Sequence, residues 1–88
     1  MKYFRIEDFT PYSELFPKLS KREIEILSLF RIGLTRSEIA LKLNVSVRTI
    51  DAHLNSAMHK YELNSSSELK ALFNFIIQDT FINLISST

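Results

Sequence analysis

TRSEIALKLNVSVRTIDAHLNSAMHKY, residues 35–61, has the pattern of two helices joined by a tight turn. Thr35 followed by Glu38 is a capping box, with which the first helix begins, and Asn44-Val45 makes the turn. Ser46 is a favourable N-cap for the second helix. The apolar residues of the second helix recur at helical spacing and fill one face: Val47, Ile50, Leu54, Ala57, Met58 and Tyr61.

The opposite face of the second helix is short, polar and lightly basic. At about 100° per residue it carries Arg48, Ala52, Asn55 and His59, with Thr49 and Ser56 at its flanks. A face of this kind suits a helix that lies in the major groove of DNA. The stretch therefore predicts a helix-turn-helix with double-stranded DNA as its partner.

The segment before this motif predicts another helix. Ser20 and Glu23 form a second capping box, and Gly33 lies where a left-handed residue would end the helix. Its expected buried stripe consists of Ile24, Ile26, Leu27, Leu29, Phe30 and Ile32. In the helix that follows Thr35, the residues available to face inward are Ile39, Ala40, Leu41 and Leu43.

A long last helix begins at the serines of residues 65–67 and Glu68. Its apolar residues recur every three or four positions: Leu69, Leu72, Phe73, Ile76, Ile77, Phe81, Leu84 and Ile85. A single domain of 88 residues cannot easily cover so long an apolar stripe by itself. Either a second protein covers the stripe or the helix folds back onto the N-terminal segment.

Residues 1–18 form an aromatic N-terminal extension, which we separate from a domain at residues 19–88. Its rings are Tyr3, Phe4, Phe9, Tyr12 and Phe16. Thr10 can cap a brief helix with Pro11 in its first position, and Pro17 then stops it. Two interpretations are open: the rings form a docking patch for a protein partner, or they fill gaps around the helix that begins at Ser20.

Composition excludes several classes of function. With 45% hydrophobic residues and a single glycine, the chain is expected to be all-α. It has no cysteine, and His53 and His59 point about 240° apart on one helix, so we expect no metal and no cofactor. No nucleophile–base set or phosphate-binding glycine loop is present, so we expect no enzyme activity.

The net charge of the whole chain is +1, but residues 18–60 carry eight basic and four acidic residues, a net charge of +4. This excess favours a polyanionic partner. Neither a secretory signal nor a membrane span is apparent. We therefore expect a cytoplasmic protein associated with the bacterial nucleoid.

Residues 19–72 resemble the LuxR/GerE-type helix-turn-helix family, the DNA-binding domain of many bacterial transcription regulators. The resemblance rests on LSKREIEILSLF, on IGLTRSEIALKLNVSVRTIDAHL and on SAMHK, in this order. The matching positions include Leu19, Arg22, Glu23, Glu25, Leu27, Gly33, Glu38, Ile39, Ala40, Leu43, Ser46, Thr49, Ile50, His53 and Lys60. The resemblance implies four main helices.

The resemblance also implies roles for particular residues. Positions that match the family's base contacts are Asp51, Ala52 and Asn55. Positions that match its phosphate contacts are Thr35, Arg36, Arg48, Thr49 and Lys60. For Thr49 a local hydrogen bond in the first helical turn is the alternative, and for Lys60 a surface role at the C-terminal end of the helix dipole. Pairing of the last helix in a dimer is implied for Leu69, Leu72, Phe73, Ile76 and Ile77.

Two departures from the family pattern bear on function. Many relatives carry Lys or Arg where this chain has Asp51, Ala52, Asn55 and His59, so fewer phosphates are neutralised here. Glu62 stands where relatives usually place the glycine that ends the helix. A left-handed Glu62 would cost about 1–2 kcal/mol, unless Asn64 ends a longer helix.

These inferences predict an all-α, four-helix domain with an aromatic N-terminal extension and a long C-terminal helix. We expect a stand-alone bacterial transcription regulator, without a receiver or ligand-sensing domain, that binds duplex DNA as a homodimer. The alternative is a protein-interaction module, derived from a helix-turn-helix, that binds or sequesters another regulator and has no DNA binding of its own.

Overall fold

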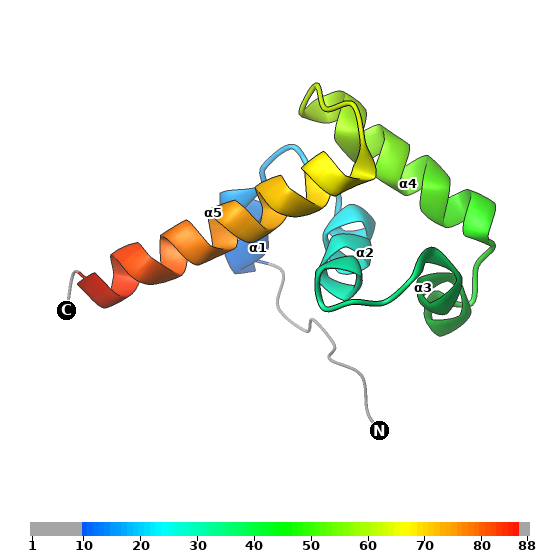
Figure 1. Ribbon diagram of the computed structural model, residues 1–88, viewed down its shortest axis with the longest axis horizontal. Helices are drawn as coiled ribbons and strands as arrows, with labels where there is room; N and C mark the ends of the chain where they lie inside the picture. The colour runs from blue at the N-terminus through cyan, green and yellow to red at the C-terminus, as the bar shows by residue number, and fades with distance from the viewer. Residues whose placement is uncertain (1–9, 87–88) are drawn as a thin grey trace.

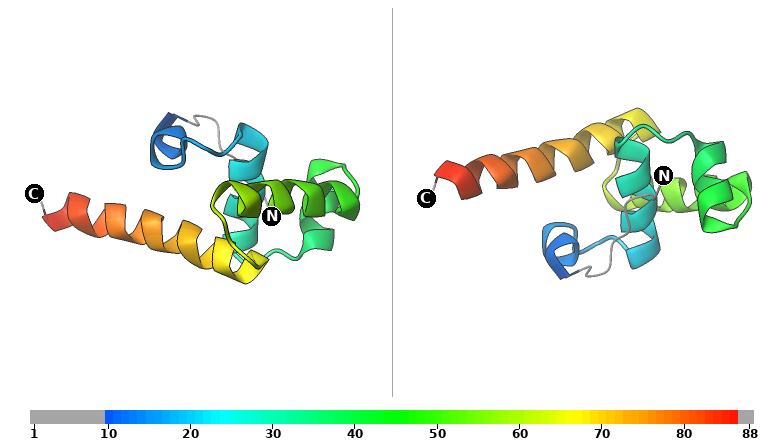
Figure 2. Two further views of the ribbon diagram at one scale, coloured as in Figure 1. Left: turned by 90° about the horizontal axis from the view of Figure 1, so that it is seen from above. Right: turned by 90° about the horizontal axis from the view of Figure 1, so that it is seen from below.

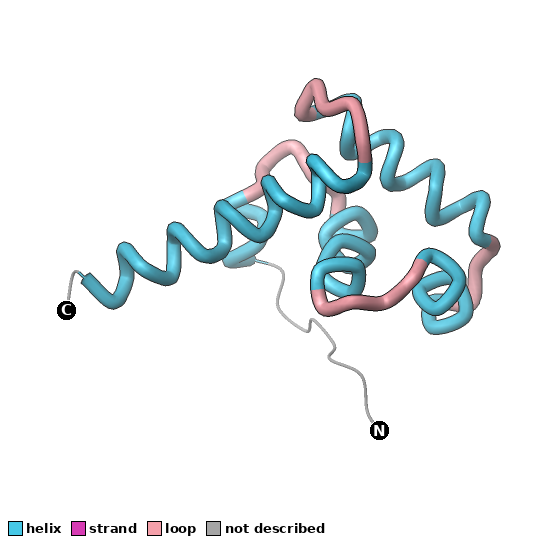
Figure 3. The backbone as a smooth tube through the Cα atoms, viewed as in Figure 1, coloured by secondary structure: helices cyan, strands magenta, loops and turns pink. Residues whose placement is uncertain are grey.

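The computed structural model describes residues 10–86, which fold into five helices (Figure 1). The short helix α1 (Thr10–Leu15) precedes four main helices: α2 (Lys21–Arg31), α3 (Arg36–Leu43), α4 (Val47–Lys60) and α5 (Ser66–Ser86). Loops and turns connect them, and residues 10–86 contain no strand (Figure 3). The expected all-α fold is confirmed. The aromatic residues Tyr3, Phe4 and Phe9 lie outside the described range.

The expected capping residues begin the helices. Ser20 Oγ accepts the Glu23 N–H at 3.1 Å, and the Glu23 carboxylate accepts the Ser20 N–H at 2.7 Å. Thr35 and Glu38 make the same pair of bonds at 3.2 and 2.9 Å. Ser46 Oγ accepts the Thr49 N–H at 3.1 Å. Because each contact lies within one helical turn, local sequence is enough to determine where α2, α3 and α4 begin.

Helices α2, α3 and α4 each end at a residue with positive φ: Gly33 at 108°, Asn44 at 57° and Glu62 at 56°. Two backbone hydrogen bonds close each of these ends. At the end of α4, the Leu63 N–H donates to the Met58 carbonyl at 2.9 Å and the Glu62 N–H to the His59 carbonyl at 3.2 Å. The expectation that Asn64 could end a longer helix is therefore wrong, because the chain already reverses at Glu62.

Helices α2 and α4 form the centre of the fold, since each contacts the other and both α3 and α5. The largest fully buried aliphatic side chains are Ile24, Ile26, Leu27, Ile39, Ile50, Leu54 and Leu69. Three residues expected to face inward are exposed: Ile32 at 55%, Leu41 at 85% and Val47, in the first turn of α4, at 40%. Ile32 is the C-cap of α2, beyond its last helical residue. Leu41 lies almost opposite the buried pair Ile39 and Ala40 at 3.6 residues per turn.

Helix α5 packs on the domain along its first half and extends beyond it along its second half (Figures 1 and 2). Leu69 and Phe73 are each 1% exposed, whereas residues 81–86 are all exposed. Within the range 10–86, no helix combines the length and the hydropathy that are needed to span a membrane. The second half of α5 is therefore an apolar surface that projects from the domain.

Phe16, just after α1, joins the N-terminal segment to α5. Its ring stacks on that of Phe73, with 4.6 Å between centroids and 21° between planes, and Phe16 is 1% exposed. Tyr12 and Leu15 also pack against the core. Phe16 and Tyr12 therefore contribute to the packing of the domain, and the ring contact of Phe16 is with α5. The division at residue 18 stays a prediction.

Candidate nucleic-acid interface

The polar face of α4 is open to solvent. Arg48, Ala52, Asn55 and His59 are all exposed, at a spacing that follows one side of the helix. The apolar face is closed, because Ile50, Leu54 and Ala57 have exposed fractions of 0–1%. Of the three expected base-contacting residues, Ala52 and Asn55 thus lie on the open face, and Asp51 is half-buried beside it.

Asp51 is paired with Arg36, one of the residues expected to contact phosphate. Arg36 Nε lies 2.8 Å from Asp51 Oδ1, and this ion pair joins α3 to α4. Arg36 Nη2 donates to Ser66 Oγ, also at 2.8 Å, at the start of α5. The structure therefore brings an expected phosphate contact and an expected base contact together and neutralises both charges.

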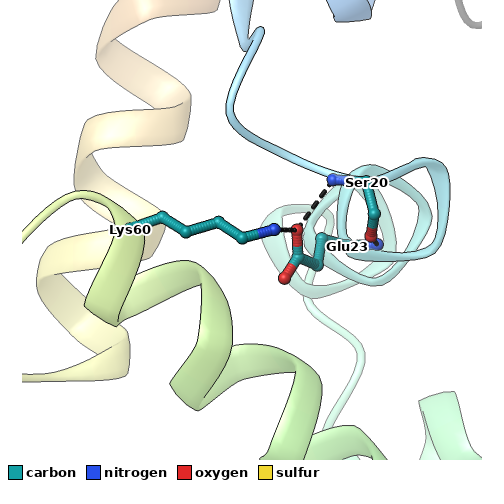
Figure 4. A network of polar contacts seen from close by, with 3 residues as sticks. All are labelled: Ser20, Glu23 and Lys60. Carbon is teal, nitrogen blue, oxygen red and sulfur yellow. Dashed lines mark hydrogen bonds and ion pairs between the residues drawn. The ribbon is translucent and has the colours of Figure 1, made fainter.

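Lys60, another expected phosphate contact, points toward α2. Its Nζ lies 2.7 Å from Glu23 Oε1, the same oxygen that accepts the Ser20 N–H (Figure 4). The Glu23 side chain is only 3% exposed, and that of Lys60 is 35% exposed. The sequence left Lys60 two possible roles, a phosphate contact or a surface lysine at the end of the helix dipole, and neither role includes this contact with Glu23. In the structure Lys60 compensates a buried carboxylate and ties the end of α4 to the start of α2.

The environment of Glu23 favours its charged form. Burial by itself raises the pKa of the Glu23 carboxyl, but the hydrogen bonds from Lys60, the Ser20 backbone and Ser56, with the positive charge of Lys60, outweigh it. The pKa of Glu23 therefore lies below its ordinary value of 4.5. Burial and the nearby Glu23 charge raise the pKa of the Tyr61 hydroxyl. The Glu23 carboxylate is thus charged at neutral pH.

The two threonines expected to contact phosphate both have local partners. Thr35 Oγ1 accepts the Glu38 N–H, as described above for the cap of α3. Thr49 Oγ1 lies 3.0 Å from Ser46 Oγ within the first turn of α4, which is the local hydrogen bond that the sequence left as the alternative. Arg48 is exposed, and its guanidinium makes no ion pair with any described residue. Arg48 is therefore the cation of this face that is available to a phosphate.

The residues expected to form a dimer interface need correction. Leu69 and Phe73 are buried in the core of their own domain, and Leu72, Ile76 and Ile77 are partly buried. Of the exposed apolar residues of α5, Phe75, Phe81, Ile82 and Ile85 occupy an arc of about 120° on the side away from Leu69 and Phe73, whereas Leu84 lies close to the side of Leu69 and Phe73. The spacing of apolar residues at three and four positions could not distinguish the buried side of α5 from its exposed side, because both sides carry apolar residues.

Sequence reasoning missed the residues that hold the cations of this region. Ser66 and the Phe30 ring hold Arg36, and Glu23 holds Lys60. For Glu23 a signal was present: it lies three and four residues before Ile26 and Leu27, on the buried side of α2. Ser66 and Phe30 carry no such signal, because their contacts depend on how the helices pack.

In the described part of the chain, no three His, Cys, Asp or Glu side chains gather where they could hold a metal ion. The structure has an exposed polar helix, α4, a preceding helix, α3, joined to it by a turn with a left-handed residue, and two further main helices that support the pair. This arrangement defines a helix-turn-helix domain, a class of domain that bacterial regulators use to bind DNA.

Residues 17–73 match the family described as bacterial regulatory proteins, luxR family, and the chain belongs to that family. Similar proteins include the oxygen regulatory protein NreC of Staphylococcus carnosus (strain TM300), which is 46% identical over 63 residues. The NreC proteins of Staphylococcus aureus (strain bovine RF122 / ET3-1) and Staphylococcus epidermidis (strain ATCC 12228 / FDA PCI 1200) are 48% and 44% identical over the same length. Each match covers 72% of this chain but only 29% of the relative. No solved structure matches the chain.

Proposed function

We propose that this chain provides the DNA-binding part of a bacterial transcription regulator, with α4 in the major groove of duplex DNA. The observation that carries the proposal is the exposed polar face of α4, on a helix whose other face is fixed in the core by α2, α3 and α5. A rigid support of this kind lets a few side chains reach base edges in a fixed register. The family supports the same function, which would be exercised in the cytoplasm, at the nucleoid.

Within this proposal the side chains of α4 have different tasks. Asn55 is placed to bond an adenine edge, and Ala52 is small enough to let the helix approach the groove floor. Arg48 binds a phosphate, and the hydroxyl of Thr35, which accepts the Glu38 N–H, retains its proton to donate to one. The hydroxyl of Thr49 does so when Ser46 is the donor of the bond between them. Lys60 serves mainly to hold α4 against α2 through Glu23.

We further propose that the regulator acts as a homodimer. A helix-turn-helix protein that reads two half-sites needs two recognition helices related by symmetry. The exposed stripe of Phe75, Phe81, Ile82 and Ile85 on α5 supplies an apolar surface that a second copy would cover. Most of the stripe lies on the half of α5 that extends beyond the domain, remote from α4, so pairing there leaves α4 open (Figure 1).

The charge distribution favours a second candidate, a module that binds another protein instead of DNA. Two of the three cations expected to contact phosphate are already paired with carboxylates, Arg36 with Asp51 and Lys60 with Glu23. A face with so few available cations binds DNA weakly outside its specific site. One experiment separates the two candidates.

The experiment measures binding of a labelled pool of random duplexes, by fluorescence anisotropy, at low and moderate salt. We expect the unmodified chain to bind at low salt and to enrich particular sequences from the pool. Arg48→Ala should weaken binding to all duplexes and reduce the salt slope by about 0.9, the value for one phosphate contact. Asn55→Ala should instead change which sequences are enriched, by about 1–3 kcal/mol at one base pair.

Arg22→Ala is the charge-matched control for Arg48→Ala, because Arg22 lies on α2 and pairs with Glu25 of the same helix. It should leave the salt slope unchanged. If the unmodified chain binds no duplex at low salt while it remains folded, the DNA-binding proposal is wrong and the protein-interaction module is favoured.

A further inference from the structure

Arg36 is held at the junction of the four main helices by three contacts. Besides its ion pair with Asp51 on α4, it donates to Ser66 at the start of α5. Its guanidinium carbon lies 5.6 Å from the centre of the Phe30 ring on α2. The contacts with Ser66 and Phe30 do not involve Asp51, so both remain possible when Asp51 is replaced. We therefore expect Asp51 to neutralise the charge of Arg36 more than it fixes the position of the Arg36 side chain.

The carboxylate of Asp51 occupies the place on Arg36 that a phosphate oxygen would take. A guanidinium binds carboxylate and phosphate oxygens with the same N–H geometry. The two side chains are 41% and 49% exposed, so their ion pair is weak and open to exchange with an incoming anion. Ser66 and Phe30 present no negative charge that competes for this position.

We propose, on the basis of the DNA-binding function above, that Asp51 competes with DNA phosphate for Arg36 and thereby determines specificity. On non-specific DNA the carboxylate stays with Arg36, and the pair contributes no net charge to phosphate binding. At a site that places a cytosine beside Asp51, the carboxylate accepts the cytosine N4 amino group. Arg36 is then released to a backbone phosphate, so a base contact and a phosphate contact are made together.

The variant Asp51→Asn tests this coupling because it removes the competitor and keeps the size of the side chain. With the random duplex pool, the affinity of Asp51→Asn at low salt should increase about threefold to fivefold, and the salt slope should steepen by about 0.9, the value for one new phosphate contact. The affinity ratio between duplexes enriched by the unmodified chain and the random pool should fall. Asp79→Asn, the same change on the exposed part of α5, should alter neither quantity.

The double variant Arg36→Gln with Asp51→Asn identifies the cation. Its salt slope should return to that of the unmodified chain, because the residue that Asp51 released is gone. An equally steep slope in the double variant would overturn the inference, since Asp51 would then act only by its own repulsion of phosphate. An unchanged slope in Asp51→Asn would overturn it as well.

These outcomes differ from a failure of the proposed function. If neither the unmodified chain nor Asp51→Asn binds any duplex, DNA binding itself is wrong, and the competition between Asp51 and phosphate is wrong with it. If the unmodified chain binds and only the slopes disagree, the DNA-binding function stands and the role of Asp51 alone is rejected. Circular dichroism of each variant shows that it remains folded.

Discussion

At the scale of single residues, the ion pair of Lys60 with Glu23 contains the most buried charge of the described ion pairs. A carboxylate that is 3% exposed is costly to keep without a cation, even when one backbone N–H bonds to it. Lys60 therefore has a structural role, because it neutralises a buried carboxylate. Periodicity and charge in the sequence do not distinguish Lys60 from a lysine on the surface.

We expect Lys60→Ala to lower the free energy of unfolding by about 1–3 kcal/mol, because it leaves the Glu23 carboxylate buried and short of a partner. Chemical denaturation at neutral pH measures the loss. Lys21→Ala, at an exposed position on α2, should stay within about 0.5 kcal/mol of the unmodified chain. Equal stability of the two variants would contradict a stabilising role for the pair.

The same pair makes stability depend on pH in the acid range. Since the pKa of folded Glu23 lies below 4.5, its stabilising contribution is complete above the unfolded pKa and is lost as the pH falls through the lower, folded pKa. Denaturation curves at neutral pH and at about pH 3 should show this loss. Glu23→Gln should reduce the pH dependence but not abolish it, because the pKa of Glu38 is also lowered by its bonds with Thr35.

Glu62 has a left-handed backbone conformation, which is unfavourable for most residues that carry a side chain. Its φ of 56° is comfortable for glycine and strained for glutamate. Glu62→Gly should stabilise the domain by about 1 kcal/mol and raise Tm by roughly 4–8 °C in thermal denaturation. Asn64→Gly is the control, since Asn64 is not among the described residues with positive φ. A gain in both variants would show that the loop, and not the strain at Glu62, limits stability.

At the scale of the helix, α5 combines a face that belongs to the core with a face that does not. Phe73 and Phe75 are two residues apart and chemically identical, yet they are 1% and 66% exposed. The difference follows from helix geometry, because two residues turn the side chain by about 200°.

The pair Phe73→Ala and Phe75→Ala tests that orientation. Phe73→Ala should cost about 3–5 kcal/mol, because it removes a buried ring and its stack with Phe16. Phe75→Ala should change the free energy of unfolding by less than about 1 kcal/mol in a monomer. Denaturation at low protein concentration compares them. Similar losses for both variants would mean that α5 is rotated about its axis.

What could be predicted from the sequence depends on how far apart the interacting residues lie. Ser20, Thr35, Ser46 and Gly33 begin and end helices through contacts within one turn, and all four were predicted. The pairs Glu23–Lys60, Arg36–Asp51 and Phe16–Phe73 join different elements. Their geometry depends on the packing of the helices, which periodicity does not encode. Helical spacing predicted the open face of α4, and the resemblance to the family agreed with it, but neither predicted the charges that are already paired beside it.

At the scale of the whole molecule, the projecting half of α5 is the surface on which the proposed dimer depends. If a second copy does, sedimentation at tens of micromolar should show a dimer, the range in which modest apolar interfaces associate. Phe75→Glu with Ile82→Glu should give a monomer that remains folded, since both residues are exposed in the single subunit. Leu41→Glu, an equally apolar and exposed site on α3, should remain dimeric. A monomeric unmodified chain would contradict the proposed dimer.

The stack of Phe16 on Phe73 also fixes how much of the chain must fold together. The family match covers residues 17–73, so it includes one ring of the pair and omits the other. A fragment cut at that boundary would have a ring-sized hole over α5, at a cost comparable with Phe→Ala, about 3–5 kcal/mol. The free energy of unfolding of a small domain is only about 5–15 kcal/mol in total. Dissecting such a regulator by family match alone would therefore isolate a DNA-binding unit far closer to its melting point than the longer chain.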